Sequence, residues 1–332
     1  MGLEPLCLHP DYSTTRRLVT NRVAAAKPPA PALPSDCQSK LPVSLGLPDS
    51  AQRQGEGGLR LQGYFKAARE EEPLVTIITI AFNAVTELEA TLQSVFSQTY
   101  NNLEYIVIDG GSKDGTVEIL QHYNDRLDYW VSEPDQGIAS AMNKGLTLAT
   151  GTLFNHLHSG DRLANSEIVA QIVASYQQEQ WRWCFGSQRL RSPAGAIAGY
   201  HCPPSFNRRL FNFVNIITHQ TVFAERSLVE AVGGFDGRYR CAMDYHLWLR
   251  FVQQAEPRQF DWVITEFLLG GRSTDMALAM KEEFLARREV LKQNFFEQFL
   301  SLLVVTARYL KRQLKITTFV RSTVPEKRVS SP

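Results

Sequence analysis

The chain has 332 residues, of which 44% are hydrophobic and 21% charged, and its formal net charge is +1 at pH 7. This composition is typical of a globular protein with a substantial core, and the near-zero charge gives no global field that would attract nucleic acid. Five scattered cysteines without zinc-ligand spacing, and the lack of a secretory signal or of an apolar run of about 18 residues, favour a cytoplasmic protein over a secreted or membrane-spanning one.

The N-terminal part of the chain differs in composition from the rest. Residues 24–34 are rich in proline and alanine, and residues 52–58 are polar and rich in glycine. Such segments bury too little apolar surface to offset the entropy of ordering. We therefore expect a disordered leader over 1–58, a folded domain over 59–273, and a C-terminal helical segment with a basic tail over 274–332.

Strands and helices alternate through the first half of the folded domain. A β-branched apolar run at 74–81 predicts a strand buried on both faces. The alternation that follows is typical of βαβ units, so we expect an α/β fold with a mostly parallel central sheet flanked by helices. Thr86 and Glu89 form a capping-box pair for the first helix. Further strands are expected at 103–108, 128–132 and 152–157, and helices at 116–123 and 138–149.

The second half has a less regular pattern. Helices are expected at 164–176, 227–232 and 243–254, and from residue 275 to about 315. Strands are expected at 181–188, 195–200, 220–224 and 260–267.

Polar or glycine-rich residues follow each of the first three strands. Asn83 follows the first, the run from Asp109 to Gly115 the second, and the run containing Asp135 the third. A carboxylate at a strand end accepts hydrogen bonds from a base or a ribose hydroxyl, and glycine lets the backbone approach a flat ring. One such run is most simply a tight turn, but three in consecutive units predict a ligand crevice.

A fourth strand end carries Ser159, Gly160 and Asp161. A carboxylate in this place is a hard ligand suited to Mg²⁺ or Mn²⁺, which complete their coordination with phosphate oxygens and water. The alternative is an aspartate that only closes a β-turn. We expect a divalent metal here, with Asp161 as its ligand.

Asp244 lies at the expected start of the helix at 243–254. An aspartate in this position caps a helix and interacts favourably with its dipole. At the rim of the crevice the same carboxylate is a candidate general base, provided that a substrate hydroxyl comes within hydrogen-bond reach. The two roles do not exclude each other.

Three histidines and an arginine are weaker candidates. His156 and His158 share one face of a strand, but without a third ligand a packing or substrate-binding role is favoured over a metal pair. His219 precedes a strand and is a candidate contact for acceptor or phosphate. Arg272 lies in a glycine-rich run and is suited to binding an oxyanion, although most such runs are plain turns.

The C-terminal segment is first apolar and then basic. The run from Phe295 to Val305 precedes Arg308, Lys311, Arg312 and Lys315. This order indicates an interfacial helix that contacts anionic lipid, at the inner face of the plasma membrane for a cytoplasmic protein. The alternative, a helix packed on the domain with its basic side chains exposed, fits the sequence somewhat better.

Taken in order, these motifs resemble those of the family 2 glycosyltransferases, inverting enzymes of the GT-A fold. The resemblance spans about 200 residues, and each motif is weak by itself, whereas the ordered set is specific. The runs that carry it are 75–83, 94–100, 105–116, 132–138, 142–145, 149–151, 219–220, 233–236, 244–245 and 270–273.

The resemblance implies a role for each matching residue. Asp161 stands at the last position of the family's DxD-type metal motif, and Asp244 where the family places its catalytic base. Contacts to the nucleotide or its diphosphate are implied for Ala81, Asn83, Asp109, Asp135 and Asn143. In three places the chain departs from the family. Ser159 replaces the first Asp of the metal motif, His156-Leu157-His158 replace an apolar run with Asn, and Ala139-Ser140 replace an aromatic–acidic pair.

The implied function is an inverting, metal-dependent transfer of a single sugar from a nucleotide-diphospho-sugar to a hydroxyl of a glycan or lipid-linked glycan. Surface polysaccharide biosynthesis is the implied pathway. One alternative is a non-catalytic protein that keeps the fold and binds nucleotide sugar. Another is a nucleotidyltransferase, which is disfavoured because no phosphate-binding loop follows the first strand.

Overall fold

The computed structural model describes residues 3–5, 15–18, 45–69, 71–269, 276–293, 296–304 and 306–307. Its strands are β1 (Leu3–Pro5), β2 (Thr15–Leu18), β3 (Gly55–Gly57), β4 (Tyr64–Lys66), β5 (Val75–Ala81), β6 (Leu103–Asp109), β7 (Tyr129–Ser132), β8 (Leu153–His156), β9 (Arg162–Leu163), β10 (Trp183–Arg191), β11 (Ile197–His201), β12 (Phe223–Glu225) and β13 (Arg258–Leu268). Its helices are η2 (Leu59–Gln62), α1 (Leu88–Phe96), α2 (Thr116–His122), α3 (Ile138–Leu148), α4 (Ile168–Glu179), α5 (Arg208–Phe211), η3 (His219–Thr221), α6 (Arg226–Val232), α7 (Met243–Gln254) and α8 (Met276–Leu291).

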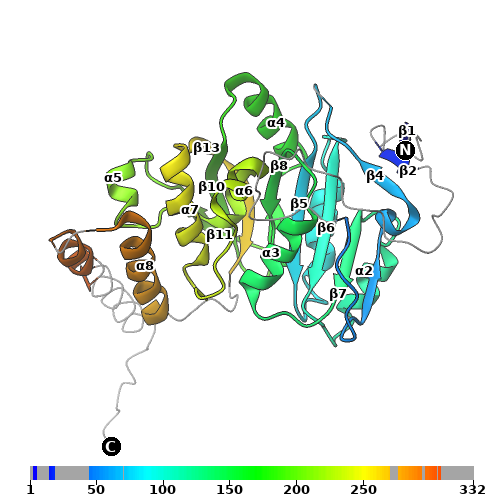
Figure 1. Ribbon diagram of the computed structural model, residues 1–332, viewed down its shortest axis with the longest axis horizontal. Helices are drawn as coiled ribbons and strands as arrows, with labels where there is room; N and C mark the ends of the chain where they lie inside the picture. Colours follow the sequence, from blue (N-terminus) through cyan, green and yellow to red (C-terminus); the bar gives the residue numbers. More distant parts are fainter. Residues whose placement is uncertain are drawn as a thin grey trace, which may run out of the picture.

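A twisted sheet of ten strands runs through the molecule, with helices on both of its faces (Figure 1). The strand order is β3-β7-β6-β5-β8-β12-β10-β13-β9, and β11 pairs with β10. The central strands β7, β6, β5 and β8 are parallel, so their carboxyl ends meet at one edge. At that edge Ala81 pairs with Asp109, and Asp109 with Ser132, which brings the predicted strand ends side by side.

Two main apolar cores lie against the opposite faces of the sheet. Helices α1, α2 and α4 pack their leucines and isoleucines into one core, and α3, α6 and α7 pack into the other. Helix α3 approaches β5 closely at Gly145, where a Cβ would lie 2.3 Å from the side chain of Ile78. The predicted α/β class, with a largely parallel central sheet covered by helices, is confirmed.

The start of the first helix differs from the prediction. Helix α1 begins at Leu88, and its N-cap residue Glu87 makes no side-chain capping bond. Glu89 instead accepts a hydrogen bond from the hydroxyl of Tyr123 at 2.6 Å. The predicted capping box of Thr86 and Glu89 is therefore wrong, because a tertiary partner on α2's C-terminal side takes the Glu89 carboxylate.

The sheet reaches further towards the N-terminus than expected. Residues 55–57 form β3 and pair with β7, upstream of the predicted domain start at residue 59. Strands β1 and β2 pair in a separate small sheet with β4. Residues 45–54 of the predicted leader are also described, and there Leu47 is buried and Arg53 pairs with Glu133. The remaining parts of the predicted leader, 1–2, 6–14 and 19–44, lie outside the described residues. Towards the C-terminus, α8 and a helix over 296–304 match the predicted helical pattern. Lys292, whose φ is 49°, lies between these two helices and ends the first of them. Among the described residues, no helix is both long and apolar enough to cross a bilayer.

Candidate active site

The carboxyl ends of β5 and β6 form the floor of the candidate site. The carbonyl of Ala81 accepts a hydrogen bond from the backbone N–H of Gly110 at 2.9 Å, so the turn after β6 lies against β5. A Cβ on Gly110 would come within 3.3 Å of the Phe82 ring, which is 49% exposed. An exposed aromatic face beside a glycine is a surface on which a nucleotide base can stack. Phe82 was not predicted as a site residue, although its position next to Ala81 was a usable signal.

Asp109 is fully buried, and its carboxylate is used by its own loop. It accepts hydrogen bonds from the backbone N–H of Ser112 at 2.9 Å and from the hydroxyl of Ser132 at 2.6 Å. The backbone N–H of Gly111 and the hydroxyl of Ser112 also donate to it. The structure thus gives Asp109 the task of fixing the Gly110–Gly111 turn. A direct contact between Asp109 and a nucleotide stays a prediction.

Asn83 joins the loops that follow β5 and β6. Its backbone N–H donates to the Ser112 hydroxyl at 2.7 Å, and its side-chain carbonyl accepts from the backbone N–H of Lys113 at 3.1 Å. Its φ of 49° lies in the left-handed region, which asparagine tolerates better than most residues. The side chain is exposed at the rim, where its amide can meet a ligand.

Asp135 presents a carboxylate oxygen to the turn after β6. Its Oδ1 lies 2.6 Å from the ammonium of Lys144, which also lies 2.9 Å from Glu133. Its Oδ2 is buried without a hydrogen-bond partner and would lie 3.6 Å from a Cβ on Gly110. Burial raises the pKa of Asp135, against the opposing effect of Lys144. A ribose hydroxyl could donate to this oxygen, and the nucleotide contact implied for Asp135 stays a prediction.

Asn143 has a different set of partners from the one expected. Its amide accepts a hydrogen bond from the backbone N–H of Phe235 at 2.9 Å and donates one to the carbonyl of Phe235 at 2.7 Å. Both ends of the side chain therefore hold the loop before α7 against α3. The nucleotide contact implied for Asn143 stays a prediction, since these bonds would have to open for it.

Asp161 lies in the turn after β8 and is buried. Its Oδ2 accepts a hydrogen bond from the side-chain amide of Gln220 at 3.0 Å, and its Oδ1 from the backbone N–H of Leu268 at 3.3 Å. Burial raises the pKa of Asp161 to about 7, although the bonds from Gln220 and Leu268 and the charge of Arg191 oppose the rise. A carboxylate that lacks a full positive counter-charge fits a site that receives a cation together with its ligand.

Two histidines close to Asp161 have unused ring nitrogens. The rings of His158 and His219 lie 4.4 Å apart, and the Nε2 atom of each is buried without a hydrogen-bond partner. Burial lowers the pKa of His158 to about 4 and that of His219 well below its usual value, so both rings are neutral at pH 7. His156 instead bonds a main-chain carbonyl through Nε2 and packs edge-on against Phe235. The structure brings together His158 and His219, which were predicted separately.

Asp244 lies in the first turn of α7. Its Oδ1 accepts a hydrogen bond from the backbone N–H of Tyr245 at 2.6 Å, and the side-chain amide of Asn215 lies close enough to act on the pKa of the carboxyl. Burial raises the pKa of Asp244 to about 7, the charge of Glu283 adds to the rise, and Asn215 opposes it. A base with a pKa near 7 is suited to catalysis at neutral pH.

Helix α7 is capped by a residue from another helix. The carboxylate of Glu282, on α8, accepts hydrogen bonds from the backbone N–H groups of Arg240, Cys241 and Ala242 at 2.7–3.0 Å. The N-cap position itself, Ala242, has no side-chain cap. Asp244 is therefore not the N-cap residue, because Glu282 satisfies the free N–H groups before the helix. A cap from this far along the chain leaves no local sequence signal.

One short segment, 215–220, lies near both the predicted metal ligand Asp161 and the predicted base Asp244. Gln220 donates a hydrogen bond to Asp161, and Asn215, five residues earlier, lies near the Asp244 carboxyl and lowers its pKa. A chain spans at most about 3.6 Å per residue, so the Cα atoms of Asn215 and Gln220 lie within about 18 Å of each other. The two aspartates, 83 residues apart in the sequence, are thus brought to a single region. Arg272 lies outside the described residues.

A group of three potential metal ligands lies beside α7 as well. Atoms of Asp236, His246 and Glu289 are all within 4.8 Å of one another. However, a guanidinium nitrogen of Arg238 lies 2.5 Å from Asp236 and 2.7 Å from Glu289. The protein itself thus supplies a cation that pairs with both carboxylates, and we assign no metal to this group.

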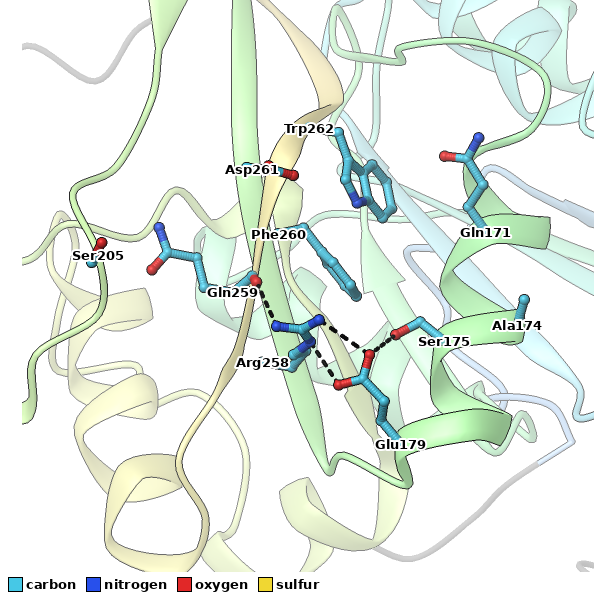
Figure 2. Close-up of a pocket in the computed structure, with 10 residues that line it drawn as sticks. All are labelled: Gln171, Ala174, Ser175, Glu179, Ser205, Arg258, Gln259, Phe260, Asp261 and Trp262. Atoms are coloured by element: carbon cyan, nitrogen blue, oxygen red, sulfur yellow. Dashed lines mark hydrogen bonds and ion pairs between the residues drawn. The ribbon is translucent and has the colours of Figure 1, made fainter.

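A hollow of about 900 Å³ lies away from these residues, between α4 and β13 (Figure 2). Arg258 and Glu179 form an ion pair of 2.8 Å across it, and the Arg258 guanidinium lies over the Phe260 ring. None of the predicted site residues lines it. Its charged groups pair with each other, so we give it no part in the chemistry.

Comparison with known proteins decides the family. The profile of Glycosyl transferase family 2 matches residues 76–184. An uncharacterized glycosyltransferase of Mycobacterium tuberculosis strain H37Rv is 38% identical over 200 residues, which cover 59% of this chain and 75% of that protein. The chain belongs to the family 2 glycosyltransferases. This glycosyltransferase has a second relative, the PGL/p-HBAD biosynthesis glycosyltransferase of Mycobacterium bovis strain BCG. The two are 30% identical over 182 residues, which cover 54% of this chain and 69% of that protein.

Solved structures of two other glycosyltransferases share the fold. The TarS 1-349 fragment of S. aureus in complex with UDP-GlcNAc matches with a TM-score of 0.54 and 16% identity, covering 76% of this chain and 77% of that chain. The mannosyltransferase PcManGT of Pyrobaculum calidifontis in complex with GDP-Man and Mn²⁺ matches with a TM-score of 0.50 and 17% identity, covering 71% and 74%. The glycosyltransferase described here therefore has the GT-A fold.

Proposed function

We propose that this protein transfers a single sugar from a nucleotide-diphospho-sugar to a hydroxyl of a glycan or lipid-linked glycan, with inversion at the anomeric carbon. The observation that carries the proposal is that Asp161, which is buried, and Asp244, which is half-buried, both have a pKa raised to about 7 and both lie near the segment 215–220 beside the carboxyl edge of the sheet. Ligands of open α/β sheets bind at this edge.

The proposed donor site combines the residues on the floor of the crevice. The base would stack on Phe82, and the ribose would bond to the free Oδ2 of Asp135 and to the rim amide of Asn83. This assignment is supported by the exposure of the Phe82 ring and by the buried, unpartnered oxygen of Asp135. The two structural relatives bind UDP, UDP-GlcNAc and GDP-Man. The choice of donor in this protein depends on residues that the fold does not fix.

In the proposed reaction Asp244 acts as the general base. Its carboxylate accepts the proton of the acceptor hydroxyl while that oxygen attacks the anomeric carbon from the side opposite the diphosphate. One carbon–oxygen bond forms and the bond to the diphosphate oxygen breaks, so the configuration inverts and a nucleoside diphosphate leaves. Asn215, whose side chain lies near the same carboxyl, would orient it.

Asp161 is the proposed protein ligand for Mg²⁺ or Mn²⁺. A bound divalent cation would supply Lewis-acid neutralisation of the leaving diphosphate. The buried carboxylate fits this role, and the free Nε2 atoms of His158 and His219 are further polar groups that can bond phosphate oxygens or water there. The Mn²⁺ in the PcManGT complex supports a metal for the fold, while Ser159 leaves a single carboxylate in this motif.

We place the reaction in the cytoplasm, in the assembly of a surface glycan. The activated donor is expected there, and the name of the mycobacterial relative refers to the biosynthesis of PGL and p-HBAD. A lipid-linked acceptor would be met at the inner face of the plasma membrane. The domain limits that we propose are a catalytic unit that ends near residue 273 and a helical segment after it.

Asp161→Ala and Asp244→Asn test the function directly. We expect each variant to lower kcat for sugar transfer by about 10²- to 10⁴-fold, because one loses the proposed metal ligand and the other the base. Transfer is measured by release of nucleoside diphosphate with a panel of donors and Mn²⁺ present. Asp261→Asn, an exposed carboxylate away from the site, is the matched control and should keep full activity.

Normal transfer by both site variants would refute the mechanism. A wild-type protein that is stabilised by a donor in a thermal-shift assay but transfers no sugar to any glycan acceptor would favour the non-catalytic alternative.

A further inference from the structure

The helix that follows α8 turns its apolar side chains outward. Residues 296–304 are helical and lie at the outer edge of the molecule, beyond α8 (Figure 1). Five of the large apolar side chains that are exposed among the described residues fall within this one helix. They are Phe296 (71% exposed), Phe299 (52%), Leu300 (39%), Leu302 (52%) and Leu303 (50%).

The inner side of the same helix is polar. Ser301 is fully buried, and its hydroxyl donates a hydrogen bond to the side chain of Gln293 at 3.1 Å. Gln298 donates to the backbone carbonyl of Gln293 at 2.7 Å. A helix that packs on its own domain normally buries its apolar stripe and exposes its polar face, so this helix has the opposite orientation.

The exposed side chains form one continuous face. Positions 296, 299, 300 and 303 follow the spacing of three and four residues that places side chains on one side of a helix. This apolar face of helix 296–304 is followed in the sequence by five basic residues and no acidic one before residue 326. The basic residues are Arg308, Lys311, Arg312, Lys315 and Arg321.

We propose that the apolar face of helix 296–304 is a membrane-docking surface, which inserts into the headgroup region of an anionic bilayer while the basic residues after it bind the lipid phosphates. Apolar burial and attraction between basic side chains and anionic lipid act together in helices of this kind. The chemistry therefore points to a bilayer that contains acidic phospholipid, which neither the fold nor the family comparisons assign.

A second copy of the chain fits this surface less well. A two-fold interface places the same patch of each subunit against the other. The five basic residues that follow the helix have no acidic residue among them, so a second copy brings no opposite charge to that stretch. An anionic lipid surface supplies the opposite charge instead.

The position of the surface also suits a lipid-linked acceptor, an argument that rests on the proposed function. Glu282, which caps α7, is joined to residue 296 by nine residues of helix and a short connection. Helical and extended spacing limit this path to about 32 Å. A bilayer at this surface would hold a lipid-linked glycan within reach of Asp244.

The test is vesicle binding by the full-length protein without donor or acceptor, so that its result is independent of sugar transfer. We expect the wild type to co-sediment with vesicles of phosphatidylcholine and phosphatidylglycerol in a 7:3 ratio. We expect about tenfold weaker binding to phosphatidylcholine alone or at 0.5 M NaCl, since salt screens surface charge. Phe296→Ser/Phe299→Ser/Leu303→Ser should also bind at least about tenfold more weakly.

Ile197→Ser is the matched control, because Ile197 is an exposed apolar residue on β11. It should leave vesicle binding unchanged. The triple variant removes only exposed side chains, so its thermal midpoint should equal that of the wild type or exceed it.

Three results would overturn the proposal. One is a wild type that stays in the supernatant with anionic vesicles. Another is a triple variant that binds as well as the wild type. The third is a wild type that is a dimer and a triple variant that is a monomer in analytical ultracentrifugation, with equal vesicle binding by the two proteins. The apolar face would then be an interface between copies of the chain.

Discussion

At the scale of single residues, two aspartates carry the proposed chemistry and share one property. Burial raises the pKa of Asp161 and of Asp244 to about 7, whereas an aspartate in water titrates near 4. Neither residue is exceptional in type. With this raised pKa, Asp244 is suited to act as a base near neutral pH, and the ionised form of Asp161 would be stabilised by a bound cation.

The pH dependence of transfer should report Asp244. Because the base works only when ionised, kcat/KM should fall about tenfold for each pH unit below 7. The charge of Glu283 contributes to the raised pKa of Asp244, so Glu283→Gln should lower that pKa and move the acid limb of the profile to lower pH. The profile is measured from pH 5 to 9 at saturating Mn²⁺.

Glu256→Gln is the control for general charge effects. Glu256 is exposed and follows the C-terminal end of α7, away from Asp244 at the start of the helix. An acid limb that stays in place in Glu283→Gln would argue against Asp244 as the titrating base.

At the scale of elements, the start of α7 depends on a neighbouring helix. Helices leave free N–H groups at their N-termini, and buried N–H groups need acceptors. Glu282 supplies a carboxylate to the N–H groups of residues 240–242, directly before Asp244. Helix α8 therefore holds in place the turn that carries the proposed base, which links the C-terminal segment to catalysis.

Glu282→Gln should weaken this connection. The amide keeps one acceptor but loses the charge that strengthens bonds from N–H groups at a helix start. We expect a loss of about 1–3 kcal/mol in the free energy of unfolding, measured by urea denaturation, together with a lower kcat because Asp244 is less well positioned. A variant with an unchanged urea midpoint and kcat would show that α8 does not support this turn.

At the scale of the whole molecule, a buried ionic network ties the N-terminal residues to the sheet. Glu104 on β6 pairs with Arg60 on η2 and accepts hydrogen bonds from Thr76 at 2.6 Å and from the backbone N–H of Thr150 at 2.8 Å. Burial disfavours the Glu104 carboxylate, but Arg60 and the threonines outweigh this effect and lower its pKa. The stability that the pairing contributes is thus present at neutral pH and lost as the pH falls through the lowered pKa.

Removing one partner of this pair should be costly. Arg60→Met leaves the Glu104 carboxylate buried without its counter-charge, and we expect the free energy of unfolding at pH 7 to fall by about 3–5 kcal/mol. Arg60→Met/Glu104→Met should recover part of that loss, because no unpaired charge remains. If the double variant lost the sum of the two single losses in chemical denaturation, the network would not act as a pair.

The sequence by itself predicted most of the sheet and the family. Apolar runs such as that at 74–81 and the helical pattern at 243–254 depend on local periodicity, and the observed β5 and α7 lie within a residue of them. The order of the motifs was sufficient for the family because it depends only on the spacing of residues along the chain. Asp135, Asp161 and Asp244 could be named for the same reason: each directly follows or begins a readable element.

Only the tertiary structure decided what those residues contact. Asp161 meets Gln220 across 59 positions, Asn143 meets Phe235 across 92, and the cap of α7 comes from Glu282, 40 positions beyond Ala242. It also turned the apolar side chains of helix 296–304 outward and left the polar Ser301 buried. Periodicity determines that a helix or strand forms, because its bonds are local, whereas the neighbours of a side chain depend on how distant segments pack, which local spacing does not encode.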